Sequence, residues 1–474
     1  MLQPQRLTAK AREYPGLRID SIEGTVLATI INPKVEDVEH LKTSAKRRTP
    51  FRSLEKALKH GHGRSYILEC KKSSPTLGDF AKDFSLDRLL SCYESRASAI
   101  SVLCEEHFFK GSYEYLKYVR ERTALPVLCK DFIICEAQLE AAVAAGADAV
   151  LLMLSLLTPE RFLELYTKAR EMGLEVLAEV DTREDALFAA SRHLPVVGIN
   201  NRNLRTLKVD LQKARELAPL FSKETAVVSE SGINEHEDLC RLPQLRAFLI
   251  GSALSGSDDV FYKANTMLYG LNKLCGITDM AALDAAIKGH AAICGLIFAP
   301  KSPRCVSMDF ARSAVKRGHP QTRFAAVFVD AAPEEIINTV KETGADYVQL
   351  HGHEDAAYIE KIRKALPGTG IIKAVACTDA KSAAAVRDYL KLCDLVLCDS
   401  QAPGSGRSFD WSIIPADADK KRILLSGGIG IANLKEALAQ GFAGVDMNSA
   451  LEKVKGAKDP ELVEEAFGII KDFI

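Results

Sequence analysis

Short apolar runs alternate with amphipathic stretches along the chain from residue 66 onward. The runs are rich in Val, Ile and Leu, as expected for parallel strands whose two faces are both covered. The intervening stretches carry apolar residues at helical spacing and a glycine near the end, as in EAQLEAAVAAGA at 136–147 and PERFLELYTKAREMGL at 159–174. The pattern therefore predicts repeated strand–helix units.

The runs fall into two sets of eight. The first set occupies residues 66–71, 99–103, 126–130, 148–152, 175–179, 195–199, 226–230 and 247–250. The second set occupies residues 271–275, 293–297, 324–328, 346–350, 371–374, 394–398, 422–426 and 443–447. Eight strand–helix units in roughly 200 residues are typical of a (β/α)8 barrel. We therefore expect an α/β protein with two tandem (β/α)8 (TIM) barrels, as domains 1–256 and 257–474 with a seam near 257–270.

A doubly wound sheet is the alternative architecture for alternating strands and helices. Each set would then need to stop at about five to seven strands, which is the usual size of such a sheet. In addition, no Gly-rich GxGxxG segment follows the first run of either set. Tandem barrels are therefore favoured.

The last two runs of each set end in similar loops of small residues. SESGI (229–233) is followed by IGSALS (250–255), and SGGIG (426–430) is followed by MNSAL (447–451). Loops after strands seven and eight of this barrel often bind phosphate, because glycines let backbone N–H groups approach the anion and serine adds a donor. One such pair would indicate only tight turns. Two pairs at the same topological position favour phosphate binding.

Charged and amide side chains gather at the strand ends of the first set: Glu69, Lys71, Lys130, Glu179, Asn200, Arg202 and Glu230. Active sites of this fold use the carboxyl ends of strands, and residues two apart in a strand share a face. Such a cluster indicates general acid–base chemistry on a phosphorylated, carboxylated substrate. Phe109 and Phe132 follow strands two and three and could face an aromatic ring, although each alone is more often a packing residue.

The second set presents different groups at its strand ends. Cys275 ends the first strand, Lys301 and Arg304 follow the second, His351 follows the fourth, and Asp399 ends the sixth. A cysteine and an aspartate across a barrel mouth can act as base and acid in an isomerisation by proton transfer. Taken singly, Cys275 is more often one of twelve structural cysteines, and Asp399 is as often a helix cap.

Composition narrows the class of protein. The chain has 474 residues, 47% of them hydrophobic, and a net charge of −1, which argues against nucleic acid as a partner. The most basic stretch, KTSAKRRTPFR at 42–52, is interpreted as a solvated helix end. The N-terminus lacks a secretory signal, and the longest apolar run, AVLLMLSLL at 149–157, is too short to span a bilayer. The cysteines have no zinc-binding spacing. We expect a cytoplasmic monomer with no metal, cofactor or membrane partner.

The first half of the chain resembles a known family through the ordered segments ECKKSSPT, PVLCKDFI, LAEV, VGINNRNLRTL, VSESGI and FLIGSAL. It is similar to indole-3-glycerol-phosphate synthase of tryptophan biosynthesis, over residues 1–256. The resemblance implies closure of 1-(2-carboxyphenylamino)-1-deoxyribulose 5-phosphate to an indole, with loss of carbon dioxide and water. It also implies that the segment before residue 66 is a helical extension that covers the barrel mouth.

The same resemblance implies roles for individual residues. Lys130 would be the general acid of ring closure, and Glu179 would act in dehydration or stabilise the cationic intermediate, with support from Glu69 and Lys71. The implied substrate-binding residues are Phe109, Phe132, Asn200, Arg202, Glu230 and Ser231. The implied phosphate-binding residues are Ser74, Gly232, Gly251 and Ser252, together with Lys71.

The second half resembles phosphoribosylanthranilate isomerase through KLCGIT, FAPKSPRCVS, VQLHG, CDSQAPGSGRSFDW, LLSGGIG and GVDMNSA. The resemblance implies an Amadori rearrangement of a phosphoribosylated anthranilate, whose product is the substrate implied for the first half. Cys275 would be the base, Asp399 the acid that opens the ribose ring, and Arg304 and His351 substrate-binding residues. The phosphate end would comprise Gly428, Asp446 and Ser449, and a flexible loop would contain Gly404 and Gly406.

Two other functions fit part of this pattern. A pair of other phosphosugar barrels, such as histidine-pathway isomerases or ribulose-phosphate epimerases, would share the phosphate loops but not the ECKK and KLCGIT segments. A non-catalytic module that binds a phosphoribosyl ligand would lack the acids and bases at the strand ends, and these are all present. A bifunctional enzyme of tryptophan biosynthesis is therefore the function that the sequence favours.

Overall fold

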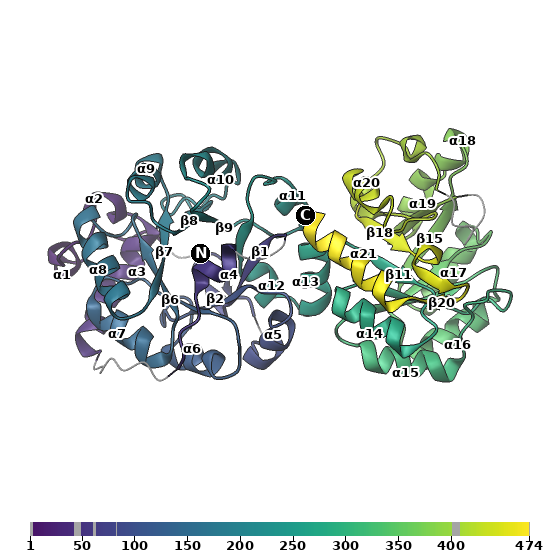
Figure 1. Ribbon diagram of the computed structural model, residues 1–474, viewed down its shortest axis with the longest axis horizontal. Coiled ribbons are helices and arrows are strands. Elements are labelled where there is room, and N and C mark those ends of the chain that lie inside the picture. Colours follow the sequence, from purple (N-terminus) through teal and green to yellow (C-terminus); the bar gives the residue numbers. More distant parts are fainter. Residues whose placement is uncertain (1–2, 42–48, 60–62, 82, 401–407, 474) are drawn as a thin grey trace. The chain divides into compact units, whose positions relative to one another are not determined.

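The chain folds into two compact units, Met1–Val260 and Phe261–Ile474. The computed structural model describes residues 3–41, 49–59, 63–81, 83–400 and 408–473. Each unit contains a closed barrel of eight parallel strands (Figure 1). The prediction of two tandem (β/α)8 barrels is therefore confirmed. Most of the basic stretch 42–52, and the predicted loop residues Gly404 and Gly406, lie outside the described residues.

The first barrel follows the strand order β1-β10-β9-β8-β7-β6-β5-β4 around its circumference. Its strands are β1 (Ser65–Cys70), β4 (Ala99–Leu103), β5 (Val127–Lys130), β6 (Ala149–Met153), β7 (Glu175–Val180), β8 (Val196–Asn200), β9 (Ala226–Glu230) and β10 (Ala247–Ile250). Almost every strand residue is buried, because helices cover the outer face and side chains fill the interior.

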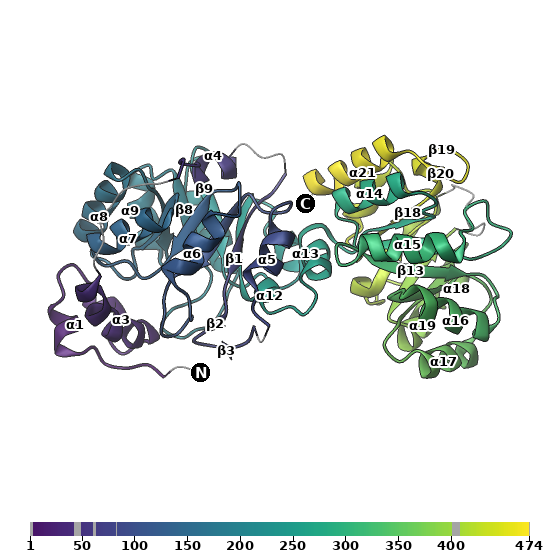
Figure 2. The same cartoon turned by 90° about the horizontal axis from the view of Figure 1, so that it is seen from below.

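Helices surround this barrel and extend it at the N-terminus. The surrounding helices are α5 (Leu86–Tyr93), α6 (Tyr113–Arg120), α7 (Glu136–Ala145), α8 (Pro159–Glu171), α9 (Arg183–Ser191), α10 (Gln212–Leu217), α11 (His236–Cys240) and α12 (Ser252–Ser255). The extension comprises α1 (Ala9–Glu13), α2 (Ile19–Ile22), α3 (Val26–Asp37) and α4 (Leu54–Lys59). Figure 2 shows α3 at the same end of the first unit as the short hairpin of β2 (Ser73–Ser74) and β3 (Gly78–Asp79). This end is the mouth of the barrel, because the hairpin directly follows the carboxyl end of β1.

The strands of the second barrel follow one another around it in sequence order, β11 to β18. Its strands are β11 (Lys273–Cys275), β12 (Ile293–Ile297), β13 (Arg323–Phe328), β14 (Tyr347–Leu350), β15 (Gly370–Ala376), β16 (Leu395–Asp399), β17 (Ile423–Leu425) and β18 (Gly444–Met447). Its helices are α13 (Val260–Tyr269), α14 (Met280–Gly289), α15 (Met308–Gly318), α16 (Pro333–Thr343), α17 (Ala356–Ala365), α18 (Ala380–Ala383), α19 (Val386–Leu392), α20 (Leu434–Ala439) and α21 (Pro460–Phe473). A hairpin of β19 (Glu452–Val454) and β20 (Ala457–Lys458) follows β18.

Two strands begin or end differently from the prediction. The strand expected from residue 271 begins at Lys273, and the Asn272 side chain accepts the backbone N–H of Val445 at 3.1 Å. The strand expected to reach Lys71 ends at Cys70, and the Lys71 backbone N–H donates to the Ser255 hydroxyl at 3.3 Å. Both of these hydrogen bonds join residues that are far apart in the sequence.

Strand register brings the polar residues of the first barrel to one level. Lys130 pairs with Leu103, Glu179 with Met153, and Asn200 with Glu230, in each case at or near the carboxyl end of the strand. The pairing of parallel strands therefore assembles the predicted cluster at the mouth of the barrel. Among the described residues, no helix is both long enough and apolar enough to cross a membrane.

Two candidate active sites

The mouth of the first barrel holds a cavity of about 390 Å³. Most of the residues predicted for the first site line it: Glu69, Lys71, Ser74, Phe109, Lys130, Phe132, Glu179, Asn200, Arg202, Ser231, Gly232, Gly251 and Ser252. Glu230 is 1% exposed and reaches the site through Lys130. The predicted groups, which are spread over most of the first unit's sequence, therefore belong to one place.

Lys130 lies within a row of alternating charges. Its Nζ is 2.6 Å from Glu230 Oε2 and 3.7 Å from Glu69 Oε2, and Glu69 Oε1 is 2.8 Å from Lys71 Nζ. Burial lowers the pKa of Lys130, but the carboxylates of Glu230 and Glu69 outweigh burial and hold the pKa above its usual value. Lys130 is therefore positively charged, and the carboxylates of Glu230 and Glu69 hold its ammonium group from two sides.

Two glycines leave the space that these carboxylates occupy. A Cβ at Gly198 would clash with Glu230 Oε1, and a Cβ at Gly251 would clash with Glu69 Oε1. A Cβ at Gly251 would also come within 2.9 Å of Lys71 Nζ. The row of charges therefore requires glycine at Gly198 in β8 and at Gly251 in the loop after β10.

Glu179 has a different protonation state from its neighbours. Burial, and then the charge of Glu230, raise the pKa of Glu179 to about 8, although Lys130 opposes this shift. Glu179 Oε1 is buried without a hydrogen-bond partner among the described residues. A carboxyl group that holds its proton near neutral pH is suited to proton transfer.

Apolar side chains also line this cavity. The rings of Phe109 and Phe132 lie 6.0 Å apart between centroids, at an interplanar angle of 39°. Val26, Leu27 and Ile30 of α3 also line the cavity. The site therefore combines aromatic and aliphatic surface, suited to a planar ring, with proton donors and acceptors.

The loops after β9 and β10 have the backbone geometry of an anion site. Ser231 and Gly232 both have positive φ values, 64° and 89°. Gly251 precedes the short helix α12, which begins at Ser252. Successive backbone N–H groups in such turns can converge on an anion, and Lys71 adds a positive charge nearby.

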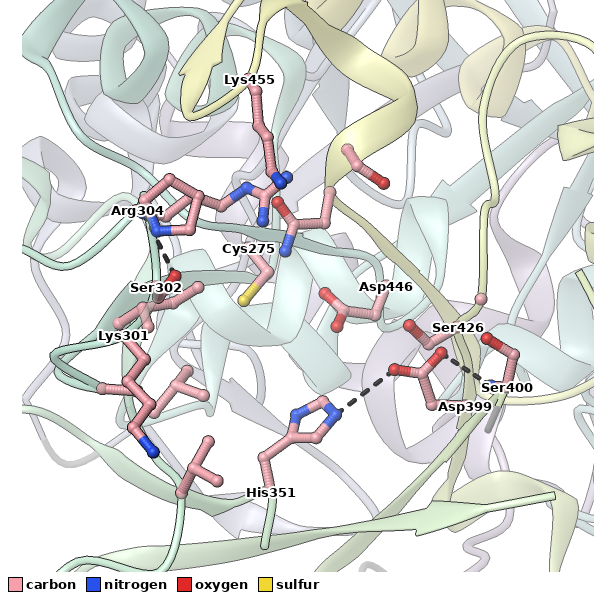
Figure 3. A pocket seen from close by; sticks show the side chains of 18 of the residues that line it. Cys275, Lys301, Ser302, Arg304, His351, Asp399, Ser400, Ser426, Asp446 and Lys455 are labelled. Carbon is pink, nitrogen blue, oxygen red and sulfur yellow. Dashed lines mark hydrogen bonds and ion pairs between the residues drawn. The ribbon is translucent and has the colours of Figure 1, made fainter. Parts of the chain in front are cut away.

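The second barrel holds a larger cavity of about 640 Å³ at its mouth (Figure 3). The predicted residues that line it are Cys275, Lys301, Arg304, His351, Asp399, Gly428, Asp446 and Ser449. Gly427 and Gly428 have φ values of 86° and 66°, in the left-handed region that favours glycine. The second site is thus assembled in the same topological position as the first.

Cys275 lies above a buried ion pair. Lys273, two residues earlier on β11, is fully buried and donates from Nζ to Asp446 Oδ1 at 2.9 Å. Burial raises the pKa of Cys275, and the charge of Lys273 opposes this shift. The lysine therefore favours the thiolate that a base requires.

Asp399 lies across the cavity from Cys275 (Figure 3). Its Oδ1 accepts the Ser400 backbone N–H at 2.7 Å, and its Oδ2 lies 3.3 Å from His351 Nε2. The His351 ring is oriented by Gln349, whose Nε2 is 3.0 Å from His351 Nδ1. The aspartate is fixed by one backbone bond and keeps its second oxygen beside the cavity.

Arg304 is held by the hairpin of β19 and β20. Its Nε and Nη2 donate to the two carboxylate oxygens of Glu452 at 2.6 and 2.9 Å. Lys458 also donates to Glu452, at 2.7 Å. Burial raises the pKa of Glu452, but Arg304 and other donors lower it to about 2, so the carboxylate stays charged. This cluster of two cations and one anion fixes the Arg304 guanidinium at the edge of the cavity.

Two family models together match most of the chain. The model "Indole-3-glycerol phosphate synthase" matches residues 22–268, and the model "N-(5'phosphoribosyl)anthranilate (PRA) isomerase" matches residues 272–468. A "Tryptophan biosynthesis protein TrpCF" of Salmonella typhi is 38% identical over 460 residues, which cover 95% of this chain and 100% of that protein. The chain belongs to the bifunctional TrpCF family.

Other members of the TrpCF family are similar over most of their length. Proteins of the same name are 38% identical in Haemophilus influenzae, over 86% of this chain and 87% of that protein, and 36% identical in Yersinia pestis, over 95% and 96%. The first barrel is thus the synthase domain and the second the isomerase domain of a tryptophan-biosynthesis enzyme. The enzyme is a lyase and an isomerase that acts on phosphorylated anthranilate compounds.

Several residues of the isomerase barrel were not predicted from the sequence. Lys273 and Glu452 contact predicted residues, and Lys458 contacts Glu452. In the sequence these three residues look like ordinary strand and hairpin residues. Lys455, near the tip of the hairpin, lines the cavity, and Figure 3 shows it beside Arg304. It forms no ion pair with the described part of the chain. The KVKGAK segment was the signal in the sequence, because it places three lysines around a turn glycine.

Proposed function

We propose that Lys130 is the general acid of ring closure in the synthase barrel. Its ammonium group would donate a proton to the substrate's carbonyl oxygen as the aromatic ring attacks the carbonyl carbon. The observation that carries this proposal is the 2.6 Å contact of Lys130 Nζ with the buried Glu230 carboxylate. This contact keeps the lysine charged and aims it into the cavity.

The other groups of this cavity divide the remaining steps. Glu179 would transfer a proton in the dehydration step, a role supported by its raised pKa. Glu69 and Lys71 would support it, and Asn200 and Arg202 would orient the substrate. The anthranilate ring would lie against Phe109 and Phe132, and Ser231 would contact the substrate beside Glu230. The phosphate group would bind at Ser74, Gly232, Gly251 and Ser252 with Lys71.

In the isomerase barrel, we propose Asp399 as the acid and Cys275 as the base. Asp399 would protonate the ring oxygen of the ribose as its bond to C1 breaks, which leaves an iminium group between C1 and the anthranilate nitrogen. The Cys275 thiolate would then remove the proton from C2, and the resulting enol-amine becomes the C2 ketone when C1 takes up a proton. Arg304 would bind the carboxylate of the anthranilate group, and His351 would contact the opened sugar. The placement of Cys275 and Asp399 on opposite sides of one cavity supports this division.

Asp446 suits a different role from the predicted phosphate contact. Its carboxylate is 5% exposed and accepts the bond from Lys273. A second negative charge beside a phosphate group would repel it. We therefore assign the phosphate end to Gly428 and Ser449, and Asp446 to holding Lys273 under Cys275.

The two activities are proposed to divide at the predicted seam, as 1–256 and 257–474. The compact units, which meet between Val260 and Phe261, support this division. A monomer is the proposed active form, because the described residues that line each cavity belong to a single unit. A cytoplasmic location is also proposed, since nine of the twelve cysteines are buried thiols, as is usual in a reducing compartment.

One assay tests both proposed sites. Purified enzyme is mixed with phosphoribosylanthranilate, and loss of anthranilate fluorescence is recorded together with the rise of indole absorption. The wild type should show both signals. Cys275→Ala should show neither, but should regain the indole signal when 1-(2-carboxyphenylamino)-1-deoxyribulose 5-phosphate is supplied. Lys130→Met should lose only the indole signal. A different pattern of lost signals in either variant would contradict the proposed assignment of the two sites.

A further inference from the structure

Helix α3 of the N-terminal extension carries a buried cation. The Lys34 side chain is 6% exposed, and its Nζ donates to Asp131 Oδ1 at 2.9 Å, where the Asp131 side chain is 1% exposed. Burial lowers the pKa of Lys34, but the charge of Asp131 outweighs burial and raises it, so the lysine remains charged. Removing either partner would leave the other charge buried and uncompensated.

Asp131 lies between two residues of the synthase site. It directly follows Lys130 and precedes Phe132, whose backbone N–H donates to Asp131 Oδ1 at 2.9 Å. The second oxygen, Oδ2, accepts the hydroxyl of Tyr113 at 3.0 Å and the Nε2 of Gln138 at 3.3 Å. The carboxylate therefore fixes the loop after β5 to α3, α6 and α7 at once.

The same helix contacts the loop that carries the second aromatic ring. Asp37 Oδ2 lies 2.9 Å from His107 Nε2 at an exposed site. Inside this loop, the buried Glu105 carboxylate accepts the backbone N–H groups of His107, Phe108 and Phe109 at 2.8 to 2.9 Å. The apolar face of α3 lines the cavity, and its polar end thus contacts both loops that carry the phenylalanines.

We propose that Lys34 is a positioning residue of the synthase reaction. Through Asp131 it sets the direction in which Lys130 and Phe132 enter the cavity, and so it couples the N-terminal extension to ring closure. Two apolar side chains would hold α3 against the barrel at least as well, whereas an ion pair also fixes a direction. This inference rests on the roles proposed above for Lys130 and Phe132.

The first test is Lys34→Met, which keeps most of the side-chain volume and removes the charge. Synthase kcat at saturating substrate should fall at least about ten-fold, because small displacements of an acid are costly. Isomerase activity of the same preparation should stay within about two-fold, since the second barrel shares none of these contacts. Lys34→Arg, which keeps the charge, should recover a measurable part of the lost kcat.

A matched control is Lys10→Met on α1. Lys10 donates to Glu36 and Glu39 at 2.7 and 2.6 Å, so it also pairs with the polar side of α3, but in solvent. It should leave synthase kcat within about two-fold, as exposed pairs contribute little. An equal loss in Lys10→Met and Lys34→Met would overturn the proposal, because any disturbance of the extension would then suffice.

The neutral pair Lys34→Met with Asp131→Asn separates positioning from stability. The double variant leaves no buried charge without a partner, so it should fold even if Lys34→Met alone does not. If Lys34 acts through Asp131, the double variant should lose about as much kcat as each folded single variant, rather than the product of the two losses. A double variant with wild-type kcat would refute the proposal, since the charge contact would then be dispensable. Lys130→Met is assayed in parallel. If it keeps wild-type kcat, the proposed role of Lys130 is wrong; if it loses kcat while the Lys34 variants do not, only the positioning role of Lys34 is wrong.

Discussion

Lys130 of β5 and Glu230 of β9 form an ion pair across the mouth of the first barrel. Their strands are separated by three others in either direction around the circumference, so the two residues come from opposite sides. A buried ion pair therefore joins opposite sides of the barrel at its mouth. Substitution of Lys130 or Glu230 should also affect the other residue, because both groups are buried and charged.

Replacement of Lys130 by methionine should abolish most synthase turnover. Loss of a positioned general acid typically lowers the rate by about 10² to 10⁴. The variant also leaves Glu230 without its cation, so some loss of stability is expected as well. Steady-state assay with the ribulose phosphate substrate measures the loss, and isomerase activity in the same sample reports on the integrity of the second barrel. Synthase turnover near that of the wild type would remove Lys130 from the mechanism.

Replacement of Cys275 by alanine should lower isomerase activity by orders of magnitude. The thiolate is the proposed base, and no other residue of KLCGIT can accept the proton. Synthase activity should stay within a few-fold of the wild type, because the described residues that line the first cavity all belong to the first unit. Cys294→Ala is the matched control, since it removes a buried thiol from the neighbouring strand β12 that does not line the cavity. If both variants lose the same isomerase activity, packing rather than chemistry explains the effect.

The pH dependence of the synthase should report on Glu179. Its pKa is raised to about 8, so the free enzyme gains the carboxylate as pH rises through this value. If the carboxylate is the active form, kcat/KM should rise over the same interval. Glu230→Gln removes one of the charges that raise this pKa, so the rise should move to lower pH. The pH profile of isomerase activity in the same variant is the control. If the rise in synthase kcat/KM stays at the same pH in Glu230→Gln, it does not come from the titration of Glu179.

Replacement of Lys455 by methionine should weaken substrate binding in the isomerase barrel. Arg304 is already paired with Glu452, and Lys455 adds a further positive charge at the same side of the cavity. KM for phosphoribosylanthranilate should rise several-fold, more at low salt than at high salt, because the site is open to solvent. Lys453→Met is the matched control on the same hairpin, since Lys453 is exposed and does not line the cavity. Equal rises in KM in the two variants would indicate that the positive charge of the hairpin acts over a distance, and not that Lys455 contacts the substrate.

The two halves should fold and work separately. Expressed alone, residues 1–256 should retain synthase activity and residues 257–474 isomerase activity, with some loss of stability. The single tryptophan, Trp411, lies in the second unit, so its fluorescence follows unfolding of the isomerase barrel alone. Its urea midpoint in the fragment should be close to that in the full chain. Insolubility of both fragments would show that the units depend on each other.

The strands and the residues at their ends could be predicted because both depend on local pattern. Buried parallel strands are short apolar runs, and a (β/α)8 barrel places its active site at their carboxyl ends. Residues such as Lys130 and Asp399 could therefore be located from position alone. Their roles required the family resemblance, since position does not specify which carboxylate keeps its proton.

The supporting partners could not be predicted, because they are far apart in the sequence. Lys34 and Asp131 are 97 residues apart, and Arg304 and Glu452 are 148 residues apart. No spacing rule connects such residues before the fold is known. Asp446 shows the same limit, since its place in a phosphate-like loop was visible but its pairing with Lys273 was not.

The β19–β20 hairpin separates an anchor from a tip. Glu452 and Lys458 form its buried base, whereas Val454 and Lys455 are exposed. A library that varies the tip alone would therefore keep Arg304 in place while changing the side chain at position 455, which lines the cavity. This gives protein engineers a small, independently adjustable segment with which to adapt the isomerase to substituted anthranilates.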